Sequence, residues 1–213
     1  YLAPLAEEMN KSRRMVALQS QALAESGFGV LLIDLGGCGD SGGSLASASW
    51  HGWIDDACQA ATWLRTRLPN VPLWMWGLRA GCLLASAAAS AMPTPAHLLL
   101  WQPPISGKLV LHQFLRLRVG AQLLDGTHKG VVQQLRTDLA AGRSVLVSGY
   151  ELPPAVADGL DLAQLLPLAT SQRVCWLETS PREHPELLPA SLELIRRWAP
   201  ERALQSRAVR GPA

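Results

Sequence analysis

The sequence predicts an α/β fold with a mostly parallel sheet, because short apolar runs alternate with stretches of helical periodicity. Four continuous apolar runs have the length of strands that are buried on both faces. They cover residues 28–35, 71–76, 97–102 and 173–179. We expect these strands to lie parallel in one sheet, connected by right-handed crossover helices on both faces.

Each predicted element has a local signal in the N-terminal half. Residues 10–26 have a helical apolar face that includes Val16 and Leu23, and Gly27 provides a stop. After the strand at 28–35, apolar residues recur at helical spacing from Trp50 to Leu68. The strand at 71–76 is followed by a helix rich in Ala, Leu and Ser at 79–91, and the next strand, 97–102, ends before two prolines.

The pattern changes after residue 104, because helical stretches then dominate as far as residue 168. They leave one short apolar run at 144–149, and strand–helix alternation resumes with a strand at 173–179, a helix at 185–198 and a strand near 203–209. We therefore interpret residues 105–168 as a helical cap or lid inserted into one core domain formed by 1–104 and 169–213. The first residues look like the end of a strand and the last like a strand cut in its following loop, so we expect truncation at both ends.

Composition excludes several classes of function. The 213 residues suffice for one large domain, and 48% hydrophobic residues supply a sizeable core. A net charge of +2 is too close to neutral to suggest a nucleic-acid partner. No apolar run approaches the roughly 18–20 residues that span a bilayer. The separated cysteines, Cys38, Cys58, Cys82 and Cys175, suggest neither a zinc site nor a disulfide framework, so we expect free thiols in a cytoplasmic protein of bacterial type.

A glycine-rich turn, DLGGCGDSGG, directly follows the first predicted strand. Its glycines, among them Gly37 and Gly39, allow a sharp backbone turn, and Asp34 and Ser41 are suited to bond the loop backbone. The turn lacks the lysine of a phosphate-binding P-loop, and it does not lead directly into a helix as a dinucleotide-binding loop does. We interpret it as a structural turn and expect no cofactor.

The second strand-to-helix junction reads Gly77-Leu78-Arg79-Ala80-Gly81. Strand, G-x-S-x-G turn and helix form the nucleophile elbow, in which the two glycines let strand and helix approach closely. Both glycines are present here, but the position of the nucleophile holds Arg79. A guanidinium stays protonated at working pH and cannot attack an acyl group. Cys82, three residues further, is better explained as a small core residue than as a displaced nucleophile.

Taken together, these motifs resemble the α/β-hydrolase superfamily over essentially the whole chain. More narrowly, PLAEEMNKSRRM, DLGGCGDSGG and WGLRAG resemble the hydrolase 2 proteins associated with exosortase A and exopolysaccharide loci. The resemblance implies an ester or thioester (acyl) hydrolase whose oxyanion loop lies near Pro4 and Leu5, just before Ala6. It also implies a catalytic acid after the strand at 173–179, for which Glu178 and Glu183 are the candidates, and a histidine after the last strand.

Two functions remain open for such a chain. One is a hydrolase with a non-standard elbow, which needs a nucleophile that the sequence does not reveal. The other is a catalytically inactive, hydrolase-like protein that binds an acidic ligand or partner. In that case Arg79 and Ala80, together with residues 5–8, hold a carboxylate or phosphate at the start of a helix. Alternatively, Arg79 pairs internally with Glu7 or Glu8 and fills the pocket. The sequence leaves the ligand and the oligomeric state undetermined.

Overall fold

The computed structural model describes residues 1–122, 130–167, 172–198 and 203–211. The chain divides into two compact units. The first comprises Tyr1–Ile33, Ala57–Ile105 and Leu165–Ala213, and the second comprises Asp34–Asp56 and Ser106–Gln164. A role for residues 105–168 as a cap over the core remains a prediction. Within the segment 105–168, residues 123–129 and 168 lie outside the described part of the chain.

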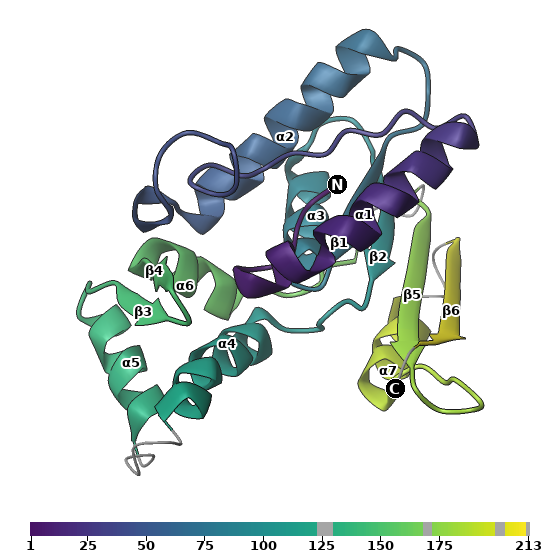
Figure 1. Cartoon of the computed structure of the whole chain (residues 1–213). Helices are drawn as coiled ribbons and strands as arrows, with labels where there is room; N and C mark the ends of the chain where they lie inside the picture. The colour runs from purple at the N-terminus through teal and green to yellow at the C-terminus, as the bar shows by residue number, and fades with distance from the viewer. Residues whose placement is uncertain (123–129, 168–171, 199–202, 212–213) are drawn as a thin grey trace. The chain divides into compact units, whose positions relative to one another are not determined.

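The first unit contains a four-stranded parallel sheet with the strand order β1-β2-β5-β6 (Figure 1). Its strands are β1 (Trp74–Leu78), β2 (His97–Trp101), β5 (Val174–Ser180) and β6 (Leu204–Arg210). β1 pairs with β2, β2 with β5 and β5 with β6, all in parallel. The predicted parallel sheet is therefore confirmed for three of the four runs named first, and the strand expected near 203–209 completes it.

Helices cover both faces of this sheet. α3 (Ala80–Ala91) and α7 (Pro189–Trp198) lie on one face, where the Trp176 ring meets the Trp198 ring at a centroid distance of 6.1 Å. α1 (Glu7–Glu25) lies on the other face, where Val16 packs against Trp76 and Leu78. The helices end close to the predicted residues. The apolar spacing in the sequence extends over those residues whose side chains pack on the sheet, so it indicates the extent of each helix as well as its buried side.

The strand predicted at 28–35 is wrong. The carbonyl of Leu31 accepts a hydrogen bond from the backbone nitrogen of Tyr1 at 2.8 Å, but no ladder forms along this segment in the described residues. Phe28 is 56% exposed and Leu32 46% exposed. A strand needs a neighbour with matching backbone groups. The edge of β1 is instead bridged by Leu2, so residues 28–35 do not pair with β1.

The second unit is mostly helical, as the sequence predicts for residues 105–168. It contains α4 (Gly107–Gln122), α5 (Val131–Ala140) and α6 (Pro154–Leu162), together with the short 3₁₀ helix η1 (Leu45–Ser47) and the first residues of α2 (Trp50–Arg67). The apolar run at 144–149 supplies β3 (Val145–Val147) and the turn of an antiparallel hairpin, whose second strand is β4 (Tyr150–Leu152). Its two turn residues, Ser148 and Gly149, both have positive φ, as tight hairpin turns require.

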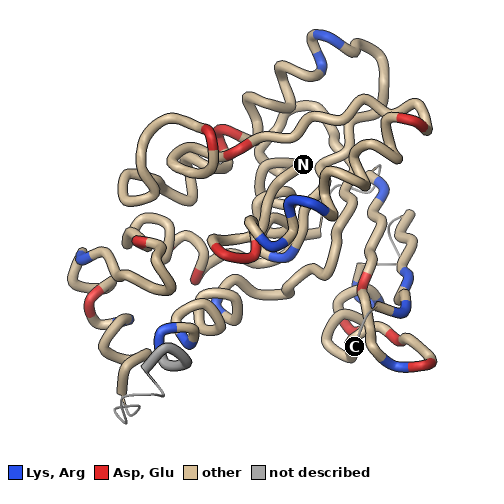
Figure 2. The backbone as a smooth tube through the Cα atoms, viewed as in Figure 1, with Lys and Arg blue, Asp and Glu red and all other residues tan. Residues whose placement is uncertain are grey.

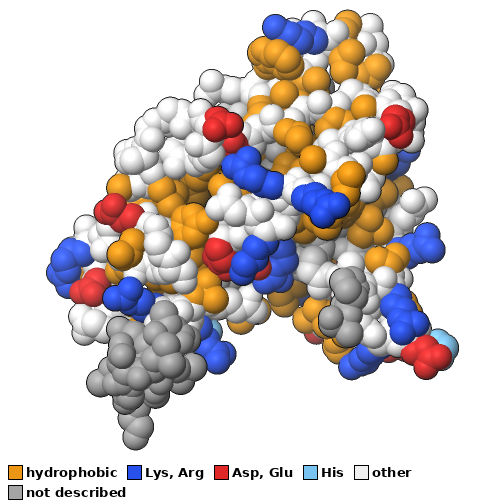
Figure 3. All heavy atoms as spheres, in the orientation of Figure 1, with side chains coloured by type: hydrophobic (Ala, Val, Ile, Leu, Met, Phe, Trp, Pro, Cys, Tyr) orange, Lys and Arg blue, Asp and Glu red, His pale blue; other side chains and the backbone are white. Residues whose placement is uncertain are grey.

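Charged residues of both signs are spread over the chain (Figure 2). On the face drawn in Figure 3, basic and acidic side chains are interspersed among hydrophobic ones. Within the described residues, no helix combines the length and apolar character that a membrane crossing requires.

Candidate functional site

The turn between β1 and α3 has the backbone of a nucleophile elbow. Arg79 is the N-cap of α3, with φ 51° and ψ −122°. Its N–H donates to the carbonyl of Trp101 at 2.9 Å, and its own carbonyl accepts from the amide of Cys82 at 2.9 Å. A residue with a Cβ adopts such a backbone only under strain, and a strained strand-to-helix turn is the feature that exposes an elbow side chain. The apex of this elbow is therefore occupied by arginine.

The two glycines of the motif are required by close backbone contacts. A Cβ on Gly77 would lie 2.5 Å from Cα of Cys82, inside the first turn of α3. A Cβ on Gly81 would collide with the carbonyl oxygen of Leu2. Since backbone atoms cannot rotate away as side chains can, only glycine fits at either position. Strand and helix thus approach as closely as the sequence motif predicts.

The side chain of Arg79 forms an ion pair with Glu8. Nε of Arg79 lies 3.1 Å from Oε1 of Glu8, and the two side chains are 30% and 33% exposed, respectively. Glu8 belongs to the first turn of α1, where a carboxylate is favoured by the positive end of the helix dipole. The adjacent Glu7 has its Oε2 buried without a hydrogen-bond partner among the described residues.

The starts of α1 and α3 lie next to each other. Leu2, four residues ahead of the N-cap of α1, bonds to β1 through Trp76 and Leu78, at 2.7 and 3.3 Å. The N-cap Ala6 has φ 52° and ψ −118°, almost the same backbone as Arg79. Two helix N-termini, each with the positive end of a helix dipole, therefore meet at the Arg79–Glu8 pair.

Three further residues of the predicted anion pocket are buried. The side chains of Leu5, Ala6 and Ala80 are at most 9% exposed. The structure thus brings residues 5–8 to the same elbow as Arg79 and Ala80, with Glu8 in direct contact with the guanidinium.

Cys82 is a core residue in this arrangement. It is fully buried, and its thiol donates to the carbonyl of Trp101 at 3.4 Å. Burial raises the pKa of the Cys82 thiol far above its ordinary value, while the bond to Trp101 and the charge of Arg79 oppose this shift. A thiol that stays protonated at neutral pH is a poor nucleophile, so the elbow gains no replacement from Cys82.

The two acid candidates lie in different environments, and neither resembles a poised catalytic acid. Glu178 is 2% exposed and has both carboxylate oxygens occupied. Its Oε1 accepts from Nε1 of Trp176 and its Oε2 from the amide of Leu188, both at 2.8 Å. These bonds fasten the loop before α7 to β5, which is a structural role. Glu183 is exposed in that loop.

The glycine-rich turn is held by the side chains that the sequence singles out. Oδ2 of Asp34 accepts from the amide of Asp40 at 2.9 Å, and the Ser41 hydroxyl donates to the carbonyl of Asp34 at 2.5 Å. Sequence reasoning missed two more residues that hold this turn, Asp56 and Trp53. The amide of Gly36 donates to Oδ2 of Asp56 at 2.8 Å, and the carbonyl of Gly36 accepts from Nε1 of Trp53 at 3.0 Å. Their positions one helical turn apart on a helix after the loop were the available signal.

Gly37 and Gly39 both have positive φ, at 76° and 54°. A Cβ on Gly39 would overlap the carboxylate of Asp34, and one on Gly37 would overlap the backbone of Ser44. The turn therefore uses its glycines for backbone shape, as expected.

Gln102 is a residue near the elbow that the sequence reasoning missed. It follows β2 with φ 47°, and its Oε1 accepts from the amide of Thr179 at 2.8 Å. The bond ties the carboxyl ends of β2 and β5 together beside the carbonyl that receives the Arg79 amide. A polar residue between a buried strand and two prolines was the signal.

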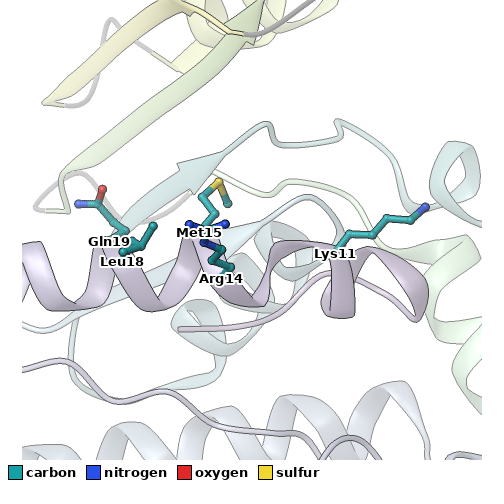
Figure 4. Close-up of a pocket in the computed structure, with 5 residues that line it drawn as sticks. All are labelled: Lys11, Arg14, Met15, Leu18 and Gln19. Carbon is teal, nitrogen blue, oxygen red and sulfur yellow. The ribbon is translucent and has the colours of Figure 1, made fainter.

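A shallow groove of 480 Å³ lies elsewhere, along α1 (Figure 4). Its lining side chains all come from that helix: Lys11, Arg14, Met15, Leu18 and Gln19. None of them is a predicted site residue. Within the described residues, no group of three His, Cys, Asp or Glu side chains could hold a metal ion.

Comparison with known proteins identifies the family of this chain. The model of the family described as serine aminopeptidase, S33, matches residues 8–145, which is more than half of the chain. The chain belongs to this family. No curated protein matches it closely enough to count as a relative.

Solved structures share the fold of this S33 chain. The α/β hydrolase GrgF from Penicillium sp. sh18 is 14% identical with a TM-score of 0.56, and the match covers 94% of this chain and 77% of GrgF. A structure from a study of carboxylesterases of the thaumarchaeon Nitrososphaera gargenis is 15% identical with a TM-score of 0.51, covering 92% and 76%. At such identities the likeness establishes the α/β-hydrolase fold.

In this S33-family chain, the strand-to-helix turn after β1 combines a strained backbone with a basic side chain. The elbow keeps its strained apex and both glycines, yet the apex side chain is a guanidinium that can donate hydrogen bonds but cannot attack.

Proposed function

We propose that this member of the serine aminopeptidase S33 family binds an acidic small molecule at its elbow without hydrolysing it. The observation that carries the proposal is the ion pair between Arg79 and Glu8, in which the apex guanidinium already holds a carboxylate. A carboxylate or phosphate group of a ligand has the same chemistry as the Glu8 side chain. The amides at the starts of α1 and α3 would add donors and a favourable dipole field.

The family motifs suggest a setting for this ligand. The resemblance of residues 4–15, 34–43 and 76–81 to exosortase A-associated hydrolase 2 proteins supports a role beside exopolysaccharide production. None of the four cysteines forms a disulfide, which supports a cytoplasmic location, where thiols stay reduced. An acyl compound with a terminal acid group would satisfy both the family's substrate chemistry and the arginine.

A second candidate function is ester or thioester hydrolysis by a non-standard mechanism. The preserved strain at Arg79, with φ 51°, favours it, because strain at an apex is usually kept where an exposed side chain has a function. This candidate needs a nucleophile other than residue 79, and Cys82 is a poor one because it is fully buried and its thiol has a raised pKa.

Covalent labelling distinguishes the two candidates. The protein is incubated with a fluorophosphonate probe and examined by intact-mass spectrometry, beside a serine carboxylesterase as positive control. We expect no adduct and no turnover of p-nitrophenyl acetate or an acetyl thioester above the buffer rate. An adduct on any residue of the elbow, or turnover that Arg79→Gln abolishes, would instead establish the hydrolase.

A further inference from the structure

We propose that Glu8 is a built-in competitor for the elbow site, so that a ligand binds by displacing its carboxylate and the site selects doubly charged anions such as phosphate monoesters. This inference rests on the proposed function, because it assigns the ligand class and the regulation of the same site. It starts from the 3.1 Å contact between Nε of Arg79 and Oε1 of Glu8.

The pair is displaceable. Both side chains are about one-third exposed, at 30% and 33%, so water reaches the contact and screens it. Ion pairs at such positions are weak, and a competing anion at moderate concentration can replace one partner. A deeply buried pair would instead be locked, because opening it would leave an uncompensated charge.

The tether of Glu8 determines which anions compete well. Glu8 is fixed in the first turn of α1, so its carboxylate is presented to Arg79 at a high effective concentration. A free monocarboxylate carries the same single charge as Glu8. It therefore displaces Glu8 only when its concentration exceeds the effective concentration of the tethered carboxylate. A phosphate monoester carries close to two charges at neutral pH, and both charges interact with the guanidinium and with the positive ends of two helix dipoles. The doubly charged anion is therefore favoured.

Glu7 opposes anion binding at this turn and does not contribute to the selection by charge. It stands beside Glu8 in the acidic first turn of α1, and its Oε2 is buried with no hydrogen-bond partner among the described residues. A buried oxygen without a donor has no local bond that offsets its charge. An incoming anion therefore meets two carboxylates at this turn, and Glu8 is the one that it must replace.

The test is a calorimetric titration of inorganic phosphate and, separately, of acetate into the whole chain at constant ionic strength. Wild type is compared with Glu8→Gln, Glu8→Asp, Glu7→Gln and Arg79→Gln, each first checked for native thermal unfolding. We expect phosphate to bind wild type more tightly than acetate. Glu8→Gln should tighten phosphate binding about three- to tenfold, Glu8→Asp less, and Glu7→Gln least, since weakly coupled surface charges have effects of this size.

The variants separate the two hypotheses. If Arg79→Gln abolishes binding but Glu8→Gln binds phosphate as wild type does, or more weakly, Glu8 is no competitor, although the anion site stands. Acetate binding as tightly as phosphate would overturn the selection for doubly charged anions. If Arg79→Gln binds as well as wild type, the proposed function itself fails, and this inference fails with it.

Discussion

Nε of Arg79 lies 3.1 Å from Oε1 of Glu8, and this contact joins the N-cap of α3 to the first turn of α1 across 71 positions of sequence. It places a carboxylate at the apex of a strained strand-to-helix turn. The same contact explains how a guanidinium is accommodated between two helix N-termini, where its charge would otherwise be opposed by both dipoles.

The close approach of β1 and α3 predicts that glycine cannot be replaced at the elbow. Gly77→Ala and Gly81→Ala should each lower the free energy of unfolding by about 3 kcal/mol or more, because the added Cβ meets backbone atoms. Chemical denaturation measures the loss. Gly42→Ala is the matched control, since a Cβ on Gly42 would meet nothing within 4 Å, and it should change stability little. Elbow variants as stable as this control would refute the close approach.

Backbone strain at the apex predicts an unusual order of stabilities. Glycine adopts the φ of 51° found at Arg79 without cost, whereas a residue with a Cβ is strained by about 1–3 kcal/mol. Glycine also has more conformational freedom in the unfolded chain, and this offsets part of the stability gained by relieving the strain. Arg79→Gly should therefore be about 1 kcal/mol more stable than Arg79→Ala in urea denaturation. The reverse order would mean that the apex is relaxed.

The bonds of Glu178 predict a structural and not a catalytic role. Glu178→Ala should lose about 2–3 kcal/mol of stability, because it leaves the buried indole N–H of Trp176 and the partly buried amide of Leu188 without their acceptor. The exposed control Glu183→Ala should stay within about 0.5 kcal/mol of wild type. Anion binding by the folded Glu178→Ala protein should be unchanged. A stable variant that loses ligand binding would point to a direct role.

Thiol pKa values predict which cysteines react and at what pH. Burial, with the nearby carboxylates of Asp34 and Asp56, raises the pKa of the Cys38 thiol to about 11. Because the thiolate is the reactive form, alkylation of Cys38 by iodoacetamide should rise about tenfold per pH unit between pH 7 and pH 10. Site-resolved mass spectrometry follows the rate. A plateau near pH 8.5 would indicate an ordinary thiol instead, and Cys82 should stay unlabelled until the protein unfolds.

Much of the fold and the elbow could be predicted because local signals fix them. Apolar spacing identifies α1, α2 and α3, and Gly77 and Gly81 identify the turn, since steric contacts at a strand-to-helix junction leave no other residue possible. The sequence also narrows the partner of Arg79 to two acids near the start of α1. It cannot choose between them, because residues 7 and 8 differ only in the direction in which each side chain leaves the helix.

The remaining features depend on distant neighbours. Residues 28–35 have the composition of a buried strand, but a ladder requires a partner whose position no local pattern encodes. Glu178 alternates correctly with the buried Val174 and Trp176 of β5, so its burial follows from strand periodicity. The bond between Glu178 and the amide of Leu188 cannot be predicted from strand periodicity, because it depends on how the loop before α7 folds back.

The most direct test of an anion site at Arg79 observes its guanidinium during ligand binding. The protein is labelled with ¹⁵N-arginine, the Nε–H resonance of Arg79 is assigned by its loss in Arg79→Lys, and inorganic phosphate is titrated at constant ionic strength. We expect this resonance to shift with saturation as phosphate replaces Glu8, while the Nε–H resonances of exposed arginines such as Arg14 do not saturate. An Arg79 resonance that stays in place, or drifts only in proportion to phosphate as those of exposed arginines do, would contradict an anion site at the elbow.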